Sequence, residues 1–279
     1  MFNASSPLEI SAFGSPFSHD VCSCTGETPL HFKWVFDHGS SSGIEVYMDY
    51  GIHLAVNSQS KYRYLWMCES KTIVPEQYKF ITNNFRSLGN IFRKIFVHDE
   101  SLLTLDPIFD YVPAAANFTW IKDRKIFQKH KLASMISSGK GFTNGHRFRN
   151  AYMQKLMANN PWIDFFGRDF KPFKIKEEPL ADYMFSITME NEAYSNYYTE
   201  KLMDCFATGT IPVYHGTPML EKMFNKEGVI ILTDDFDPNL LSQDLYLSKR
   251  DAILENFERC LNHKKADDFL YERIMADIG

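Results

Sequence analysis

The 279-residue sequence contains no run of about 20 apolar residues, the length that a membrane-spanning helix needs. Its first residues, MFNASSPLEISAF, lack the basic and apolar regions of a secretory signal peptide. Lysine and arginine form no cluster and the net charge is -5, which argues against nucleic acid as a partner because nucleic-acid binding depends on neutralising phosphates. These absences predict a soluble, cytoplasmic protein without a transmembrane segment, whose partners are small or neutral.

The sequence also lacks the residue spacings that are typical of a disulfide framework or of a metal site. The five cysteines are odd in number and mostly lie among apolar residues, which favours buried thiols in a reducing compartment over a disulfide framework. Cys22 and Cys24 have no second cysteine pair to complete a zinc site, and the nine histidines show no ligand spacing. The acidic run 233–237 follows an expected strand and is interpreted as a loop. We therefore predict no metal site.

Two common catalytic motifs are missing. Residues 137–141 resemble a P-loop, but Ser134 occupies its first glycine position and Gly141 its closing serine or threonine position. No GxSxG elbow is present. The sequence therefore argues against a P-loop nucleotidase and against an α/β-hydrolase.

The apolar fraction of 44% is ample for a core, and short apolar segments alternate with helical ones. Expected strands in the first half are 32–36, 44–48, 62–67 and 94–97, with a helix at 75–92. The second half repeats the pattern with strand 131–136, helix 147–157 and strand 163–166. After another strand at 229–232, residues 241–278 are helical in pattern. The alternation predicts Rossmann-like α/β units.

Residues 183–218 are the most informative stretch. They combine a short apolar strand at 184–188, a polar loop, a helix at 199–208 that Gly209 ends, and a second buried strand at 211–214. In an open α/β sheet, ligands bind at the loop that follows such a strand. This stretch therefore predicts half of a ligand-binding domain.

Four ordered segments within residues 130–240 resemble the fucosyltransferase-like (family 10) glycosyltransferases. Glu190-Asn191, the run 197–202 and the run 209–216 resemble the donor-binding signature of that family. Arg149-Asn150-Ala151-Tyr152 resembles its arginine-bearing helix start, and Phe166-Gly167-Arg168 resembles the strand end that follows.

The resemblance implies an α/β fold of GT-B type, with two Rossmann-like domains facing a cleft. Residues 1–127 would form the acceptor-side domain and residues 128–262 the nucleotide-sugar donor domain. Residues 263–279 would form a C-terminal helix that packs back on the first domain.

The resemblance further implies an inverting glycosyltransferase that moves fucose or xylose from GDP-fucose or UDP-xylose to a hydroxyl of a glycan acceptor, with no cofactor required. The motifs favour GDP-fucose. The compact chain, however, is similar to small virus-encoded members, among them a chlorella-virus protein resembling a xylosyltransferase that acts in the host cell. His215 stands where relatives often carry tryptophan, so both donors stay open. The alternative is a non-catalytic nucleotide-sugar or glycan-binding protein that has lost its general base.

A nucleotide-sugar transferase must hold a diphosphate, and cations and helix N-termini do this best. Lys201 lies in the first turn of an expected helix. Arg149 lies near the start of another, and its planar guanidinium is suited to bind the second phosphate through two parallel hydrogen bonds. Glu200 is suited to accept hydrogen bonds from the ribose hydroxyls. The resemblance adds Asn191 and Tyr197 as donor contacts.

The reaction also needs a carboxylate as general base, which the family places in its first domain. Our candidate is Glu69, just after the expected strand at 62–67. Its surroundings resemble a family "ESP" segment, although Lys71 replaces the proline and Met67 stands where some relatives carry a second acid. Asp99 and Glu100, at the end of the next strand, are the reserves.

Overall fold

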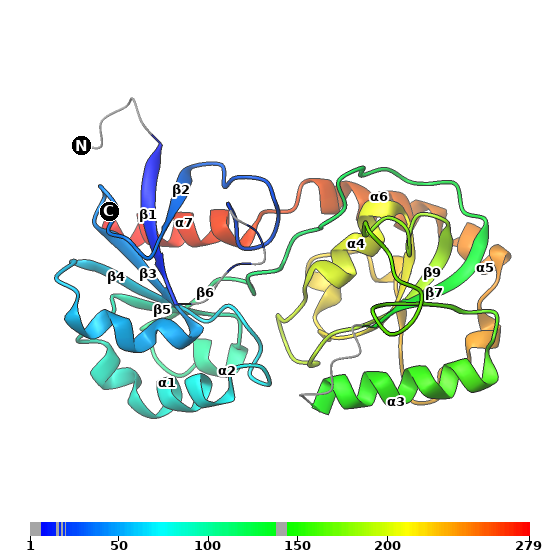
Figure 1. Ribbon diagram of the computed structural model, residues 1–279, viewed down its shortest axis with the longest axis horizontal. Coiled ribbons are helices and arrows are strands. Elements are labelled where there is room, and N and C mark those ends of the chain that lie inside the picture. The colour runs from blue at the N-terminus through cyan, green and yellow to red at the C-terminus, as the bar shows by residue number, and fades with distance from the viewer. Residues whose placement is uncertain (1–6, 15–16, 18, 20, 138–143) are drawn as a thin grey trace. The chain divides into compact units, whose positions relative to one another are not determined.

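A computed structural model describes residues 7–14, 17, 19, 21–137 and 144–279. The chain forms two compact units, which Figure 1 shows with their elements labelled. The first unit comprises the chain up to Asn117, together with Ser195–Tyr197 and Lys264–Gly279. The second comprises Phe118–Tyr194 and Tyr198–His263.

The first unit ends at Asn117, earlier than the predicted boundary at residue 127. The reason is a buried carboxylate of the second unit. Asp204 accepts hydrogen bonds from the Thr119 hydroxyl at 2.8 Å and from the Trp120 backbone N–H at 2.7 Å. Because these bonds fix residues 119 and 120, the segment that follows Asn117 already belongs to the second unit.

The first unit is built on a six-stranded parallel sheet with the strand order β2-β1-β3-β4-β5-β6. The strands are β1 (Leu8–Phe13), β2 (Phe32–Phe36), β3 (Ile44–Met48), β4 (Tyr62–Trp66), β5 (Lys94–Val97) and β6 (Phe109–Tyr111). Its helical elements are η1 (Asp49–Asn57), α1 (Pro75–Leu88), α2 (Glu100–Leu103) and α7 (Ala266–Ile278).

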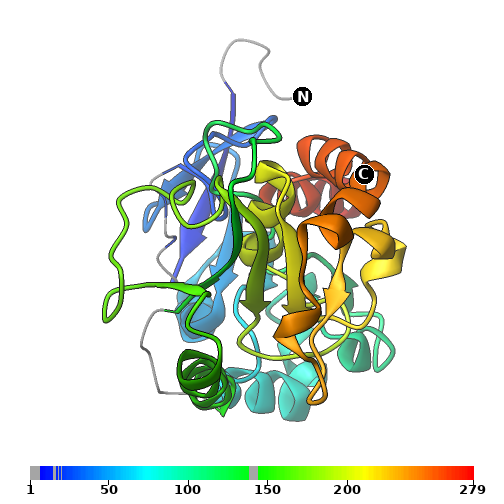
Figure 2. The same cartoon turned by 90° about the vertical axis from the view of Figure 1, so that its right-hand side faces the viewer.

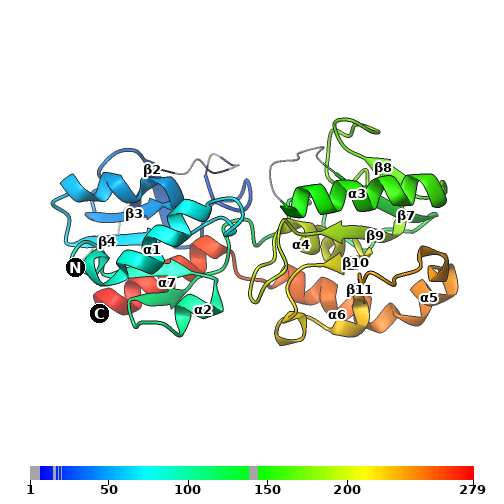
Figure 3. The same cartoon turned by 90° about the horizontal axis from the view of Figure 1, so that it is seen from below.

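Both faces of this sheet are covered, because successive side chains of a strand point to opposite faces. Tyr64 and Trp66 of β4 belong to one core cluster, to which α7 contributes Leu270 and Ile274. The intervening Leu65 belongs to the cluster that α1 covers. Figures 1 and 3 show α7, in red, and α1, in cyan, beside this sheet.

The second unit is built on a five-stranded parallel sheet with the order β11-β10-β9-β7-β8. Figure 2 shows neighbouring strands of this sheet with their arrowheads pointing the same way. The strands are β7 (Lys131–Ile136), β8 (Asp164–Phe166), β9 (Tyr183–Met189), β10 (Ile211–His215) and β11 (Ile230–Ile231). The helices are α3 (Asn144–Asn159), α4 (Glu200–Thr208), α5 (Gln243–Ser248) and α6 (Arg250–Leu261), with short 3-10 turns η2 (Leu220–Lys222), η3 (Lys226–Gly228) and η4 (Pro238–Leu240).

The elements expected from the sequence are present, some of them with shifted ends. The helix expected at 75–92 ends at Leu88, and the helical region 241–278 is divided into α5, α6 and α7. Gly209 ends α4 in the left-handed conformation, with φ 70°, as predicted. The expected α/β fold class with two Rossmann-like units is confirmed.

Two strands and one helix were not predicted. In β1 the polar Glu9 and Ser11 interrupt the apolar pattern, but Ser11 is fully buried and its hydroxyl accepts the Ser40 backbone N–H at 2.8 Å. A buried polar side chain with a backbone partner is compatible with a central strand. The other two elements, β6 and α2, are too short for a periodic signal.

All five cysteines are buried free thiols, and the reducing compartment stays a prediction. Among the helices within the described ranges, none combines the length and apolar character needed to cross a membrane. Residues 138–141 of the P-loop-like run lie outside the described ranges.

Lys129 holds the segment before β7 against the second unit. Its Nζ lies 2.8 to 3.2 Å from four acceptors, more than its three N–H groups need, namely the carbonyls of Leu180, Ala181 and Thr208 and the hydroxyl of Thr210. Lys129→Met fills similar space but removes every donor. We expect the free energy of unfolding to fall by about 3 kcal/mol, measured by chemical denaturation.

Lys125→Met is the matched control for this substitution. Lys125 is exposed and pairs with the exposed Asp123 at 2.6 Å, and such surface pairs contribute little. Equal stability of the two variants would contradict the structural role of Lys129.

Candidate functional site

A pocket of about 330 Å³ lies in the second unit, with the ends of β7 and β9 among its walls. Ile136 and Ser137 come from the end of β7, and Thr188 and Met189 come from the end of β9. Strand order reverses here, because β8 and β9 lie on opposite sides of β7. A switch point at the carboxyl ends of parallel strands is the usual ligand position in this kind of sheet.

The pocket is lined by more basic than acidic side chains. Its charged lining residues are the four cations Arg149, Arg168, Lys176 and Lys201 and the two carboxylates Glu200 and Asp204. The excess of positive charge favours an anionic ligand, and the first turn of α4, which carries Glu200 and Lys201, faces the same space. A helix N-terminus with nearby cations is a suitable phosphate site.

Glu190, directly after β9, organises the start of α4. It is 2% exposed, and its carboxylate accepts the Thr199 backbone N–H at 2.8 Å and the Thr199 hydroxyl at 2.7 Å. The Tyr214 hydroxyl donates to it at 3.3 Å. The Lys201 ammonium lies 3.3 Å from the same carboxylate and 2.8 Å from the Thr199 hydroxyl. Glu190 therefore positions both the helix cap and the lysine.

Lys201 and Glu200 stabilise each other's charges. Burial opposes the charge of Lys201, but the carboxylates of Glu190 and Glu200 raise its pKa above the ordinary value. Burial likewise opposes the charge of Glu200, but Lys201 and Lys176 hold its pKa below the ordinary value. Both groups are thus ionised near neutral pH, as the sequence prediction requires.

Arg149 projects from α3 and is 5% exposed. Burial lowers its pKa, and the nearby Glu190 and Glu200 oppose that change. An arginine keeps its charge under such conditions, so the structure holds a buried guanidinium at the pocket wall.

Gly167, between the buried Phe166 and the pocket residue Arg168, has φ 145°. A Cβ at this position would lie 1.7 Å from the Ser137 carbonyl oxygen, so only glycine fits. This close approach of the ends of β7 and β8 explains why a glycine stands between Phe166 and Arg168.

The remaining predicted donor contacts are not brought into the pocket. Asn191 follows β9 and is half-buried, but it is not a lining residue. Tyr197 belongs to the first unit, where its ring centroid lies 5.4 Å from that of His98. His215 does not line the pocket either, and its ring lies 5.4 Å from that of Phe148.

Glu69 is exposed and follows β4 in the first unit. A fully buried neighbour, Asp49, fixes the backbone at this point: its Oδ1 accepts the Cys68 N–H at 2.9 Å and the Glu69 N–H at 3.5 Å. The Tyr78 hydroxyl donates to the Glu69 carbonyl at 3.3 Å. The loop carrying the candidate base is therefore held from two sides.

The reserve candidates for the general base, Asp99 and Glu100, lie in different surroundings from Glu69. Asp99 is buried and forms an ion pair with Lys71 at 2.5 Å. The same carboxylate caps α2 by accepting the Ser101 N–H at 3.0 Å. Glu100 is exposed and lies in the first turn of that short helix. Lys71, the residue that departs from the "ESP" segment, thus pairs with the reserve candidate Asp99.

His98, directly before Asp99, is fully buried. Burial lowers its pKa to about 4, although Asp99 acts in the opposite direction and Lys71 in the same one. Between pH 6.5 and 4 the unfolded chain therefore binds a proton that the folded chain does not, so stability falls as the pH falls. The expected loss is about 3 kcal/mol for this group.

His98→Gln removes this titration and keeps polar atoms for the Tyr78 hydroxyl, which lies 3.4 Å from His98 Nε2. Denaturation at several pH values is expected to give a flatter stability profile for the variant over this window. An identical slope in both proteins would contradict the assignment.

Sequence reasoning missed three residues of this arrangement. Glu190 was quoted as part of the signature but given no role, because its function depends on Thr199 and Lys201 in the fold. Lys176 lies 3.3 Å from Asp204 and 5.0 Å from the Trp120 ring centroid. It comes from an irregular segment without periodicity, and Arg168 was noted only as part of a strand end.

Residues 126–271 match the family described as "Glycosyltransferase family 10 (fucosyltransferase) C-term". The α-(1,3)-fucosyltransferase FucT of Helicobacter pylori is 30% identical over 104 residues, covering 36% of this chain and 22% of that protein. α-(1,3)-Fucosyltransferase B of Drosophila melanogaster is 29% identical over 118 residues, covering 36% of this chain and 26% of that protein. The matches thus span about a quarter of those relatives.

Solved structures share the fold over most of the chain. A crystal structure of an α1,3-fucosyltransferase with GDP has a TM-score of 0.54 at 17% identity, covering 100% of this chain and 91% of that one. A structure of an α1,3-fucosyltransferase with GDP-fucose has a TM-score of 0.51 at 16% identity, with the same coverage. At such identities the likeness shows the fold alone, and it agrees with two Rossmann-like domains.

Proposed function

The chain belongs to glycosyltransferase family 10, and from this premise we propose that it transfers fucose from GDP-fucose to a hydroxyl of a glycan acceptor. UDP-xylose is the competing donor. The proposal needs a site for a nucleoside diphosphate and a base for the acceptor hydroxyl, and it assigns these to the pocket of the second unit and to Glu69.

The observation that carries the proposal is the basic pocket at the switch point of the second sheet. Arg149 and Lys201 meet there at the first turn of a nine-residue helix, where cations and backbone N–H groups are suited to hold a diphosphate. The pocket volume of about 330 Å³ is in the range of small-molecule sites.

In the proposed reaction Glu69 takes the proton of the acceptor hydroxyl while that oxygen attacks the anomeric carbon of the sugar. The bond from this carbon to the diphosphate oxygen breaks, and its electron pair leaves with the nucleotide. Direct displacement inverts the anomeric configuration. Lys201 and Arg149 neutralise the charge that develops on the diphosphate, which is the main electrostatic demand of the step. The protein residues named here supply both functions without a metal.

GDP-fucose is the first choice of donor because solved structures of the same fold are described with GDP and with GDP-fucose. Glu200 is assigned to the ribose hydroxyls, which are common to GDP and UDP, so it does not separate the two donors. Asn191 and Tyr197 remain proposed donor contacts from the family resemblance.

Calorimetric titration of the protein with GDP and with UDP, each with and without magnesium, tests the proposal. Product analysis with the matching sugar donors follows. We expect preferential GDP binding, unaffected by magnesium, and fucosyl transfer. Preference for UDP together with xylosyl transfer would identify UDP-xylose as the donor in place of GDP-fucose. Binding without transfer would favour the non-catalytic alternative. Binding of neither nucleotide would overturn the donor site.

A further inference from the structure

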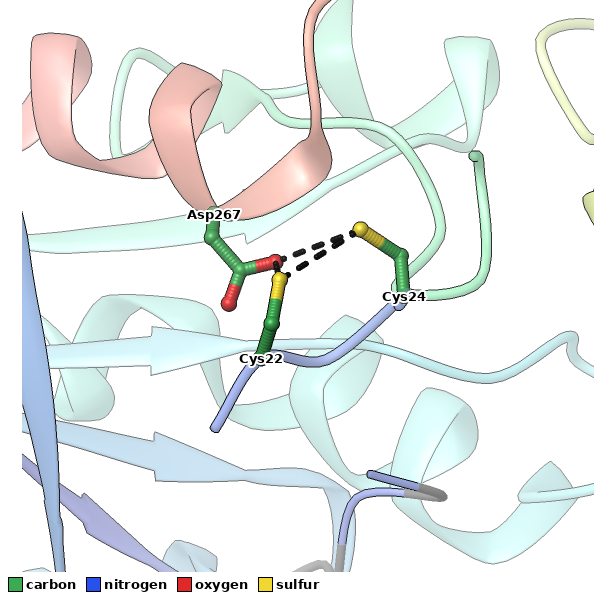
Figure 4. Close-up of side chains that lie close together, drawn as sticks. All are labelled: Cys22, Cys24 and Asp267. Carbon is green, nitrogen blue, oxygen red and sulfur yellow. Dashed lines mark hydrogen bonds between the residues drawn. The ribbon is translucent and has the colours of Figure 1, made fainter. Parts of the chain in front are cut away.

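We propose that Cys22, Cys24 and Asp267 form a binding site for a thiophilic metal ion, with Zn²⁺ as the cation to test. Figure 4 shows the two thiols and the carboxylate pointing toward one another. The cysteines come from the loop between β1 and β2, and Asp267 comes from the first turn of α7. All three residues are completely or almost completely buried and belong to the first unit, and none lines the donor pocket.

The distances between the candidate ligand atoms suit one tetrahedral ion. The Sγ atoms of Cys22 and Cys24 are 3.6 Å apart, and Cys24 Sγ lies 3.6 Å from Asp267 Oδ2. Zinc bond lengths of about 2.3 Å to sulfur and 2.0 Å to oxygen put two sulfurs about 3.8 Å apart and sulfur and oxygen about 3.5 Å apart. The remaining distance, from Cys22 Sγ to Oδ2, is 3.0 Å and lengthens by a small rotation of the thiol.

The carboxylate is already oriented for this role. Asp267 Oδ1 accepts the Trp34 indole N–H at 2.6 Å and the Ser23 backbone N–H at 3.0 Å. Oδ2 faces the two thiols and also accepts the Ser23 hydroxyl at 2.6 Å. That hydroxyl has a second acceptor, the Ala115 carbonyl at 3.1 Å, and keeps it when a metal takes Oδ2. Hydrogen bonds that hold the outer oxygen of a ligating carboxylate are typical of metal sites.

In the proposed binding step, the metal ion takes the place of two protons. A divalent cation replaces the protons of the two thiols, which are released to solvent, and binds the carboxylate through Oδ2. Two thiolates and one carboxylate are a soft ligand set that favours zinc over magnesium or calcium. A water molecule takes the fourth position. The ion then ties a loop near the N-terminus to the C-terminal helix, so its role is to stabilise the first unit.

Metal analysis of protein purified under reducing conditions is the first test. After incubation with Zn²⁺ and removal of loose metal, we expect about one zinc per chain by mass spectrometry. Cys22→Ser and Cys24→Ser are expected to lose it. Cys260→Ser is the matched control, because Cys260 is also a buried thiol, donates to the Met203 carbonyl at 3.5 Å, and lies in the second unit. This control is expected to retain the metal.

Cobalt substitution supplies a readout that does not depend on folded variants. Co²⁺ added to the wild-type protein is expected to give a thiolate-to-cobalt charge-transfer band, which Zn²⁺ abolishes by displacement. Chelation is expected to lower the melting temperature of the zinc-loaded protein. The proposal is overturned by the absence of both retained zinc and the charge-transfer band. It is equally overturned if the reduced protein re-forms a Cys22–Cys24 disulfide in place of binding metal.

Discussion

Glu69→Gln is expected to lower the rate of sugar transfer by about 10²- to 10⁴-fold, the usual contribution of a positioned general base. The amide has the size of the carboxylate but cannot take the proton of the acceptor hydroxyl. Nucleotide binding is expected to stay unchanged, because the residues assigned to the diphosphate lie in the second unit. Steady-state kinetics and calorimetry on the same variant separate these two effects.

Glu100→Gln is the matched control, because Glu100 is also exposed and also follows a strand of the first sheet. It is expected to retain nearly full activity. Asp99→Asn is a less suitable control, since it breaks the ion pair with Lys71 and alters the cap of α2. Unchanged turnover in Glu69→Gln, or a larger loss in Glu100→Gln, would remove Glu69 from the mechanism.

The sequence predicted the architecture well because most elements carry a local signal. The strands at 32–36, 44–48 and 131–136 were placed with the same ends as in the structure, since each is a short apolar or β-branched run between polar segments. β1 was missed because its burial depends on β2 and β3 on either side, which no local pattern of residues 8–13 reveals.

The pocket of the second unit was predictable only in part. Lys201 and Glu200 are fixed by the start of α4, and a helix start has a sequence signature. The role of Glu190 depends on a carboxylate reaching Thr199 and Lys201 across a loop, and the placement of Lys176 depends on an irregular segment. Such contacts follow from tertiary packing and not from spacing along the chain.

The proposed metal site of Cys22 and Cys24 also depends on a tertiary contact that spacing along the chain does not predict. Zinc was discounted because Cys22 and Cys24 lack a second cysteine pair within reach in the sequence. In the structure the third candidate ligand is Asp267, which α7 brings to the loop from the opposite end of the chain. The proposed ligand set spans such a separation that it carries no sequence motif, so the proposal rests on the fold.

Lys201→Met is expected to weaken nucleotide-diphosphate binding by about 100-fold, which corresponds to about 3 kcal/mol. The ammonium supplies charge-assisted hydrogen bonds, which are stronger than neutral ones. Its loss also leaves the carboxylates of Glu190 and Glu200 without this neutralising cation. Calorimetric titration with GDP measures the change directly.

Because Glu190 is buried, Lys201→Met also reduces stability, and binding has to be compared between folded proteins. Circular dichroism and thermal unfolding establish that the variant is folded. Lys131→Met is the control, since Lys131 is a lysine of the same unit whose ion pair with Asp164 is nearly half-exposed at 3.5 Å. It is expected to bind GDP like the wild type.

Arg149→Met provides an independent approach to the same pocket from α3. Its guanidinium is assigned to the second phosphate, so we expect a loss of affinity of similar size. Transfer is expected to suffer more than binding in both variants, because charge on the diphosphate increases as the bond to the sugar breaks. Full GDP affinity in folded Lys201→Met and Arg149→Met would show that the diphosphate is held elsewhere, and the assignment of the basic pocket would then fail.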